Sequence, residues 1–469
     1  MIQDIQTKQQ KQKFTHNGYL YVFDKHSKRD VSIKFWRCEK KNECKARLHT
    51  RNDRVVKELN EHSHGASAAL VEVALVQTLL KKRAIETQEQ PSAIVNACSE
   101  NVSQAAQASF PRVESMKQII RRKRNIMNIA PPNPINAREL VIPDEYKSYV
   151  NANGESEDFL IADSGTSDDR ILIFGRQSWI VFLRDSDVWY CDGTFKLSPL
   201  IFKHVNVLMA KRYGSVHPVL YCLLPNKSRN TYQRMFQMIR NATPGVNPRN
   251  ISSDFEQAAI SAMRDCFPDV QINGCFFHLS HNIHKQLKQC GLQSAYSNNP
   301  EFALKAKMIT ALSFVPIPSL GAYIDALADD LPDGLHPLLD WFEDNYVGRP
   351  LRRGNERRPP LFPPEMWNQY NRTVTGMDRT NNHAEAAHRK IYAELGVHHP
   401  VIWRFISCLK KIQRSRDTYY EHLVAGHPAR HKLLKYIRAD ERILRIVQQF
   451  DERDPLEYLR GLAHNYDFH

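Results

Sequence analysis

The sequence lacks any apolar run that approaches the roughly 18 residues of a membrane span, which argues against a membrane protein. Its first residues, MIQDIQTKQQKQK, are polar and lack the apolar segment of a secretory signal. We find no internal repeat. The nine cysteines are an odd number spread over 469 residues, and without a secretory signal they indicate a reducing compartment. In such a compartment, paired Cys and His bind metals more often than they form disulfides. We therefore expect a soluble, intracellular protein.

Negative charge is scarcer than positive charge. The chain has 51 Asp and Glu residues against 65 Lys and Arg residues, a formal net charge of +14. An excess of this size attracts a polyanion, and nucleic acid is the partner it suggests. The length allows about three domains of ~150 residues each.

The pattern of the chain changes several times. Residues 14–64 alternate as short strands do, and helical segments follow at 67–84, 91–100 and 111–125. A proline-rich linker spans Ala130–Asn136. Strands first at hairpin spacing and then alternating with helices predict a mixed α/β sheet up to about residue 277. From His278 the sequence is mostly helical, interrupted by a loop rich in Pro and Arg.

Three acids stand at the ends or in the middle of these elements. Asp192 lies in the apolar strand WYCDGTFK, where alternation places it on the same face as Tyr190. The Asp-Gly pair is alternatively a hairpin turn. Asp254 and Glu385 each admit a structural role, because Asp254-x-x-Gln257 and Asn382-x-x-Glu385 both fit an N-capping box.

The three acids together, on an early strand, a later strand and a late helix, resemble the ribonuclease-H-like fold of cut-and-paste transposases. The chain contains the sequence motifs RILIF, DGTFK, HPVLYCLLPNKSRNTYQRMF, SSDFEQAAI, GCFFHLSHNI, FPPEMWNQY and RTNNHAEAAHRK. Over residues 140–425 these motifs resemble those of the Mutator-like element transposases. The resemblance implies a catalytic core from 136 to 290, a helical insertion from 291 to 378, and a catalytic helix with a helical end from 379 to 469. It implies that Asp192, Asp254 and Glu385 hold two Mg²⁺ or Mn²⁺ ions, since hard oxygen ligands suit these cations and a metal pair cuts phosphodiesters. Gly193 would then let a nucleic-acid backbone approach the metals.

The N-terminal region has a metal-ligand pattern. Cys38-x5-Cys44 and His62-x-His64 offer two thiolates and two imidazoles, a set suited to structural Zn²⁺. With FTHNGYLYVF, FWRC and CKARLHT, this stretch resembles the FLYWCH zinc finger, which we place in residues 1–66. A second pair, Cys275-x2-His278, is either another structural zinc site or a packed pair at a strand–helix junction.

Basic residues gather in two places. Residues 67–135 form a helical, helix-turn-helix-like segment whose third helix ends in a cationic cluster that is a DNA contact, a nuclear localisation signal or a solvated helix face. A second cluster lies in the loop 349–358, which either contacts phosphates or is simply a mobile loop. The candidate DNA-binding residues are Lys117, Arg121, Arg122, Lys123, Arg124, Arg352 and Arg353.

Together these patterns predict an α/β protein with a ribonuclease-H-like sheet, a helical insertion and an N-terminal zinc finger. The resemblance implies a nuclear transposase that binds double-stranded DNA at element ends and target, as a homodimer or higher homo-oligomer. The alternative is a domesticated, non-catalytic DNA-binding regulator that keeps the finger.

Overall fold

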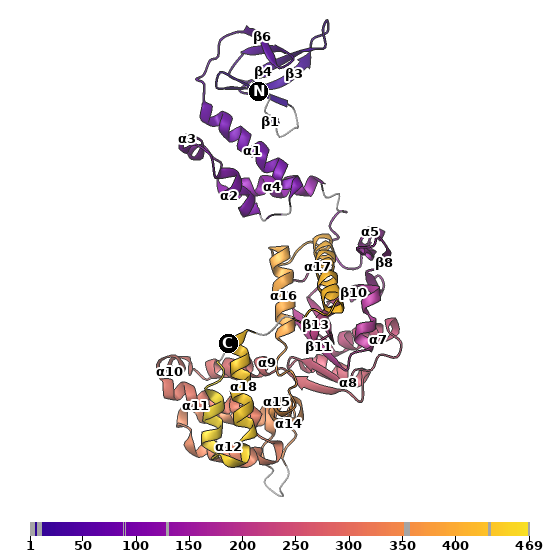
Figure 1. The fold of residues 1–469 in the computed structure, drawn as a ribbon, viewed down its shortest axis with the longest axis vertical. Helices are drawn as coiled ribbons and strands as arrows, with labels where there is room; N and C mark the ends of the chain where they lie inside the picture. Colours follow the sequence, from indigo (N-terminus) through magenta and orange to yellow (C-terminus); the bar gives the residue numbers. More distant parts are fainter. Residues whose placement is uncertain are drawn as a thin grey trace. The chain divides into compact units, whose positions relative to one another are not determined.

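The computed structural model describes residues 5–6, 12–87, 89, 91–127, 131–350, 357–429 and 433–467. The chain divides into two compact units, Met1–Pro131 and Pro132–His469 (Figure 1). Each unit has its own hydrophobic core and is described separately below.

The first unit begins with a six-stranded antiparallel sheet whose strands pair in sequence order. Left-handed residues form two of the turns, Asn17–Gly18 between β2 and β3, where φ is 49° and 77°, and Asn52–Asp53 between β5 and β6. A small core of Phe14, Tyr21, Trp36 and Leu48 packs within this sheet, as the alternating pattern predicts. The strands are β1 (Ile5–Gln6), β2 (Gln12–His16), β3 (Tyr19–His26), β4 (Ile33–Cys38), β5 (Arg47–Arg51) and β6 (Arg54–Leu59).

Four helices complete the first unit. The three predicted segments correspond to α1 (Ala68–Glu86), α2 (Pro91–Ser99) and α4 (Val113–Met127), and a short helix that the sequence did not signal is α3 (Gln104–Ala108). The Ser67 hydroxyl accepts the Leu70 N–H at 3.2 Å and caps α1. Leu80, Ile94 and Ile120 are fully buried between α1, α2 and α4, so these helices form one core.

The second unit is built on a seven-stranded mixed sheet in the order β15-β14-β11-β12-β13-β10-β9. Strands β11, β12 and β13 form an antiparallel meander, and β14 and β15 continue the sheet in parallel beyond β11. This confirms the predicted mixed α/β architecture. The strands are β9 (Leu160–Asp163), β10 (Leu172–Gly175), β11 (Val188–Thr194), β12 (His204–Arg212), β13 (Ser215–Leu224), β14 (Asn250–Ser253) and β15 (Gln271–Gly274), and a separate pair is β7 (Ser148–Val150) and β8 (Ser156–Asp158).

Helices pack on both faces of this sheet. On one face, α7 (Arg229–Ala242) and α8 (Gln257–Cys266) pack against Trp189 and Cys191 of β11. On the other, α16 (Asn382–Leu395) and α17 (Ile402–Val424) pack against Tyr190 of the same strand (Figure 1). The alternation predicted for β11 is therefore confirmed, and Asp192 belongs to the face that carries α16.

The rest of the second unit is helical. The last two helices, α18 and α19, pack against helices of the predicted insertion, and the Tyr458 hydroxyl donates to the Phe314 carbonyl at 2.6 Å. No helix among the described residues has both the length and the apolar character that crossing a bilayer requires. The remaining elements are α5 (Asp144–Lys147), η1 (Gln177–Trp179), α6 (Val181–Arg184), α9 (Phe276–Gln289), α10 (Gln293–Asn298), α11 (Pro300–Ala311), η2 (Leu312–Phe314), η3 (Ile317–Ser319), α12 (Leu320–Asp330), η4 (Asp333–Leu335), α13 (His336–Phe342), η5 (Glu343–Val347), α14 (Pro364–Trp367), α15 (Tyr370–Val374), α18 (Leu434–Gln448), η6 (Phe450–Glu452) and α19 (Pro455–Ala463).

Candidate metal centres and nucleic-acid interface

The four predicted ligands of the zinc finger meet at one point. Sulfur and nitrogen atoms of Cys38, Cys44, His62 and His64 all lie within 4.8 Å of one another. Cys38 Sγ is 3.2 Å from His64 Nε2, and Cys44 Sγ is 3.3 Å from His62 Nδ1. Ligands at the usual Zn–S and Zn–N distances in a tetrahedron lie about 3.5 Å apart. The set therefore fits a structural Zn²⁺ ion.

The tautomer of each imidazole is fixed by its second nitrogen. His62 Nε2 lies 2.8 Å from the Tyr21 hydroxyl, which leaves Nδ1 for the metal. His64 Nδ1 lies 3.1 Å from the Gly65 carbonyl, which leaves Nε2. The Tyr19 ring stacks on His62 with centroids 3.6 Å apart. Such outer contacts orient metal-binding imidazoles and raise their affinity.

Asp192 lies inside strand β11, which continues through Gly193 to Thr194 and pairs with β12 at Asp192↔Val207 and Gly193↔Asn206. The hairpin interpretation of Asp-Gly is therefore wrong. A Cβ at Gly193 would meet His204 and Asn206 at ordinary packing distances of 3.5 and 3.7 Å, so the surrounding protein does not itself require a glycine there. Asp192 itself is 8% exposed, so its carboxylate is nearly removed from water.

Neither of the other two acids belongs to a capping box. Asp254 follows β14, and its side chain accepts the Glu256 N–H at 3.1 Å, while Glu256 is the N-cap residue of α8. Helix α16 begins at Asn382 with Asn381 as its N-cap, so Glu385 lies one residue beyond the position that a capping box requires. Both acids are thus available for another role.

The segment before α16 ties this helix to the sheet. The Asn381 side-chain amide donates to the Cys191 carbonyl at 3.2 Å, and the Asn381 N–H donates to Cys275 Sγ at 3.1 Å. Just before it, Asp378 accepts the Tyr190 hydroxyl at 2.5 Å. The bonds to Cys191 and Tyr190 join residues about 190 positions apart and set the start of α16 directly on β11.

The charges of the other two acids act on Asp192. Burial and the charge of Asp254 raise the pKa of Asp192 to about 8, with a further contribution from Glu385. A divalent cation relieves such repulsion, so the residues fit one. The carboxylate oxygens do not all lie within 4.8 Å of one another, since among the described residues only the finger brings three or more ligands that close. Carboxylate oxygens that are divided between two cations about 4 Å apart do not all have to lie within 4.8 Å of one another.

Cys275 and His278 take different positions from those of a zinc pair. Cys275 is the N-cap residue of α9, and its sulfur accepts the Asn381 N–H. His278 lies near the acids, because the charges of Asp254 and Glu385 act on it, although burial still lowers its pKa. Among the described residues neither belongs to a cluster of three or more potential ligands, so the geometry favours the packed pair over a second zinc site.

Three residues near the acids escaped the sequence-based prediction. Lys227 forms an ion pair with Glu256 and lies 4.5 Å from the centroid of the Phe195 ring. Phe195 is 43% exposed, and the charge of Lys227 acts to lower the pKa of Asp192. His388 contacts Asp192 directly. All three residues lie inside the sequence motifs that resemble the transposase family. The aromatic residue directly after the DGT motif was the feature of the sequence that could have pointed to them.

The basic residues of α4 differ in their exposure and in their hydrogen bonds. Arg121 and Arg122 are exposed. Arg124 instead donates to the carbonyls of Ala84, Thr87 and Glu89 at 3.0, 3.0 and 2.8 Å, which closes the C-terminal end of α1. Its guanidinium is thus committed to the fold. Among the other candidates, Lys123 is half-buried, Lys117 pairs with Glu114 at 2.8 Å, and Arg352 and Arg353 lie outside the described residues.

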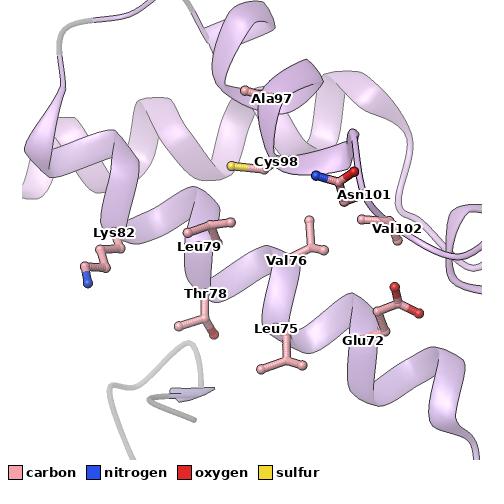
Figure 2. Close-up of a pocket in the computed structure, with 10 residues that line it drawn as sticks. All are labelled: Glu72, Leu75, Val76, Thr78, Leu79, Lys82, Ala97, Cys98, Asn101 and Val102. Atoms are coloured by element: carbon pink, nitrogen blue, oxygen red, sulfur yellow. The ribbon is translucent and has the colours of Figure 1, made fainter.

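A groove of about 510 Å³ lies between α1 and α2 in the first unit. Figure 2 shows Leu75, Leu79 and Val102 among the side chains that line it, with Glu72 near one end and Lys82 near the other. Glu72 accepts the Ser103 N–H at 2.9 Å, so this acid caps a neighbouring helix. The groove is mainly apolar and has no part in either metal centre.

Comparisons with known proteins identify both regions. Residues 5–64 match the FLYWCH zinc finger domain, and residues 188–282, which include Asp192 and Asp254 but not Glu385, match the MULE transposase domain. FLYWCH transcription factor 1 of Caenorhabditis elegans is 44% identical over 52 residues, which are 11% of this chain and 10% of that protein. The resemblance predicted from the sequence is therefore confirmed: the chain carries a FLYWCH zinc finger domain followed by a MULE transposase domain.

Proposed function

We propose that the chain is a DNA transposase of the Mutator-like type that binds terminal inverted repeats, cuts their phosphodiester bonds and joins the 3′-hydroxyl ends to target DNA. The observation that carries the proposal is the proximity of three acids, whose charges and burial raise the pKa of Asp192 to about 8. The mixed sheet, with a meander followed by parallel strands, supports a ribonuclease-H-like fold. We place the protein in the nucleus, acting as a homodimer or higher homo-oligomer on two element ends.

Each part of the chain has a role in this proposal. Asp192, Asp254 and Glu385 would hold Mg²⁺ or Mn²⁺ ions, and bound cations would activate water or a 3′-hydroxyl and stabilise the leaving oxygen. Lys227 would bind a phosphate beside the acids, and the exposed Phe195 ring next to it offers a face for a base. The zinc finger and the exposed arginines of α4 would supply most of the DNA affinity, because phosphate contacts dominate such binding.

The second candidate is a DNA-binding regulator that no longer cuts DNA. It is favoured by one observation, the similarity of the finger to a protein named as a transcription factor. The retention of all three acids favours the enzyme instead.

One experiment separates the two candidates. The purified chain is incubated with candidate element ends and Mg²⁺ or Mn²⁺, and cleavage and joining are scored separately. We expect Asp192→Asn, Asp254→Asn and Glu385→Gln each to abolish cutting while DNA binding persists, and a double variant to be no worse than a single one. Wild-type protein that binds the ends and never cuts them would favour the regulator.

A further inference from the structure

One imidazole, that of His388, lies beside Asp192 in the acidic centre. His388 lies one helical turn after Glu385 on α16, and its Nδ1 is 3.4 Å from Asp192 Oδ2. Its Nε2 is buried and has no hydrogen-bond partner among the described residues. Nδ1, not Nε2, is therefore the nitrogen that could share a cation with Asp192.

The spacing between His388 and Asp192 differs from that of a strong hydrogen bond. Charge-assisted N–H···O⁻ bonds are usually about 2.7–2.9 Å long. Two ligands that each lie about 2.1 Å from one cation are about 3.0 Å apart at a right angle and about 3.4 Å apart at the tetrahedral angle. The observed 3.4 Å is longer than such a hydrogen bond and lies close to the separations that two ligands of one cation adopt.

The helix supports the same conclusion. Residues three positions apart on a helix project from one face, so Glu385 and His388 both reach the region beside Asp192. A Glu-x-x-His pair on one helix is the arrangement with which helical carboxylate proteins hold pairs of transition-metal ions.

We propose that His388 is a nitrogen ligand of the cation held by Asp192, so that this centre takes Mn²⁺ or another first-row transition ion in preference to Mg²⁺. The inference rests on the proposed function, because the same acids hold the cation. Mg²⁺ requires oxygen ligands and accepts imidazole poorly, whereas imidazole suits the transition ions. His278 is the nearest rival, since its Nδ1 is also buried without a partner among the described residues.

Pulsed electron paramagnetic resonance on Mn²⁺ tests this directly. The zinc-loaded full chain is titrated with Mn²⁺, and the spin-echo modulation from a directly bound nitrogen is recorded with natural-abundance protein and with protein labelled with ¹⁵N at histidine. We expect a ¹⁴N modulation that converts to ¹⁵N on labelling, and this measurement needs no variant to fold. His388→Gln should lose the modulation and bind Mn²⁺ roughly tenfold or more weakly, with a smaller change for Mg²⁺.

The matched control is His383→Gln on the same helix, whose ring packs edge to face on Tyr190 at 5.5 Å. It should keep both the modulation and the Mn²⁺ affinity. Bound Mn²⁺ without a histidine nitrogen, or a modulation that persists in His388→Gln, would overturn the proposal, and the second result would assign the nitrogen to His278. If wild-type protein binds no Mn²⁺, or Asp192→Asn binds it equally well, the acidic metal centre of the proposed function fails as well.

Discussion

The stability of the second unit without divalent metal is expected to fall as the pH rises, because of Asp192. Its pKa is about 8 in the folded chain and about 3.9 when unfolded, so between these values only the folded state holds the proton. A raised pKa gives stability that is complete below about pH 4 and is lost as the pH approaches 8. The slope is about 1.4 kcal/mol per pH unit, so the sum over the roughly four pH units between the two pKa values is on the order of 5 kcal/mol.

Asp192→Asn removes this titration with little change in shape. At pH 8 without metal, we expect the variant to be more stable than wild type by about 5 kcal/mol, and at pH 5 by much less. Added Mg²⁺ or Mn²⁺ should narrow this difference, since a ligand at a hundred times its Kd stabilises the wild type by about 2.7 kcal/mol.

Urea unfolding followed by tryptophan fluorescence measures this, because of the six tryptophans only Trp36 lies in the first unit. A wild-type stability that is flat between pH 5 and 8, or an Asn variant that is the less stable protein at pH 8, would refute the reasoning.

Three further predictions concern other parts of the chain. Cys38→Ser should release one zinc per chain and unfold the finger while the second unit keeps its unfolding transition; unchanged zinc in elemental analysis would contradict the site. Replacing Arg121 and Arg122 by Glu should lower the slope of log K against log salt by about 0.9 for each lost contact, whereas Arg124→Gln should leave the slope unchanged and destabilise the first unit by about 1–3 kcal/mol, as seen in thermal melts. Lys227→Gln should reduce kcat/KM for metal-dependent cutting roughly 10²-fold with folding intact; an unchanged rate would remove Lys227 from the site.

The position of Asp192 could be predicted from the sequence because a strand has a period of two. Tyr190 and Asp192 share a face whatever the rest of the fold does, and a buried acid in an apolar strand is conspicuous. The capping boxes for Asp254 and Glu385 were wrong for a related reason. A capping box is defined by the positions of its two residues relative to the first residue of the helix. In the structure α8 begins at Gln257 and α16 begins at Asn382, so neither acid occupies the position that a capping box requires.

The contact of His388 and the role of Arg124 could not be predicted in the same way. Which side of α16 meets β11 depends on the bonds of Asn381 to Cys191 and Cys275, which are far away in sequence. Arg124 belongs to a run of four basic residues, and nothing local distinguishes it from Arg121. Only the packing of α4 beside the end of α1 commits its guanidinium to three carbonyls.

The bonds that fix the start of α16 on β11 have a consequence for synthesis. They join Tyr190 to Asp378 and Cys191 to Asn381, across 188 and 190 positions. At translation rates of about 5–20 residues per second, the ribosome adds this intervening chain in roughly 10–40 s. A nascent or truncated chain therefore holds a complete zinc finger and two of the acids while it still lacks the helix that carries the third. Under the proposed function, a truncated product of this kind would bind DNA without cutting it and would compete with the full-length protein.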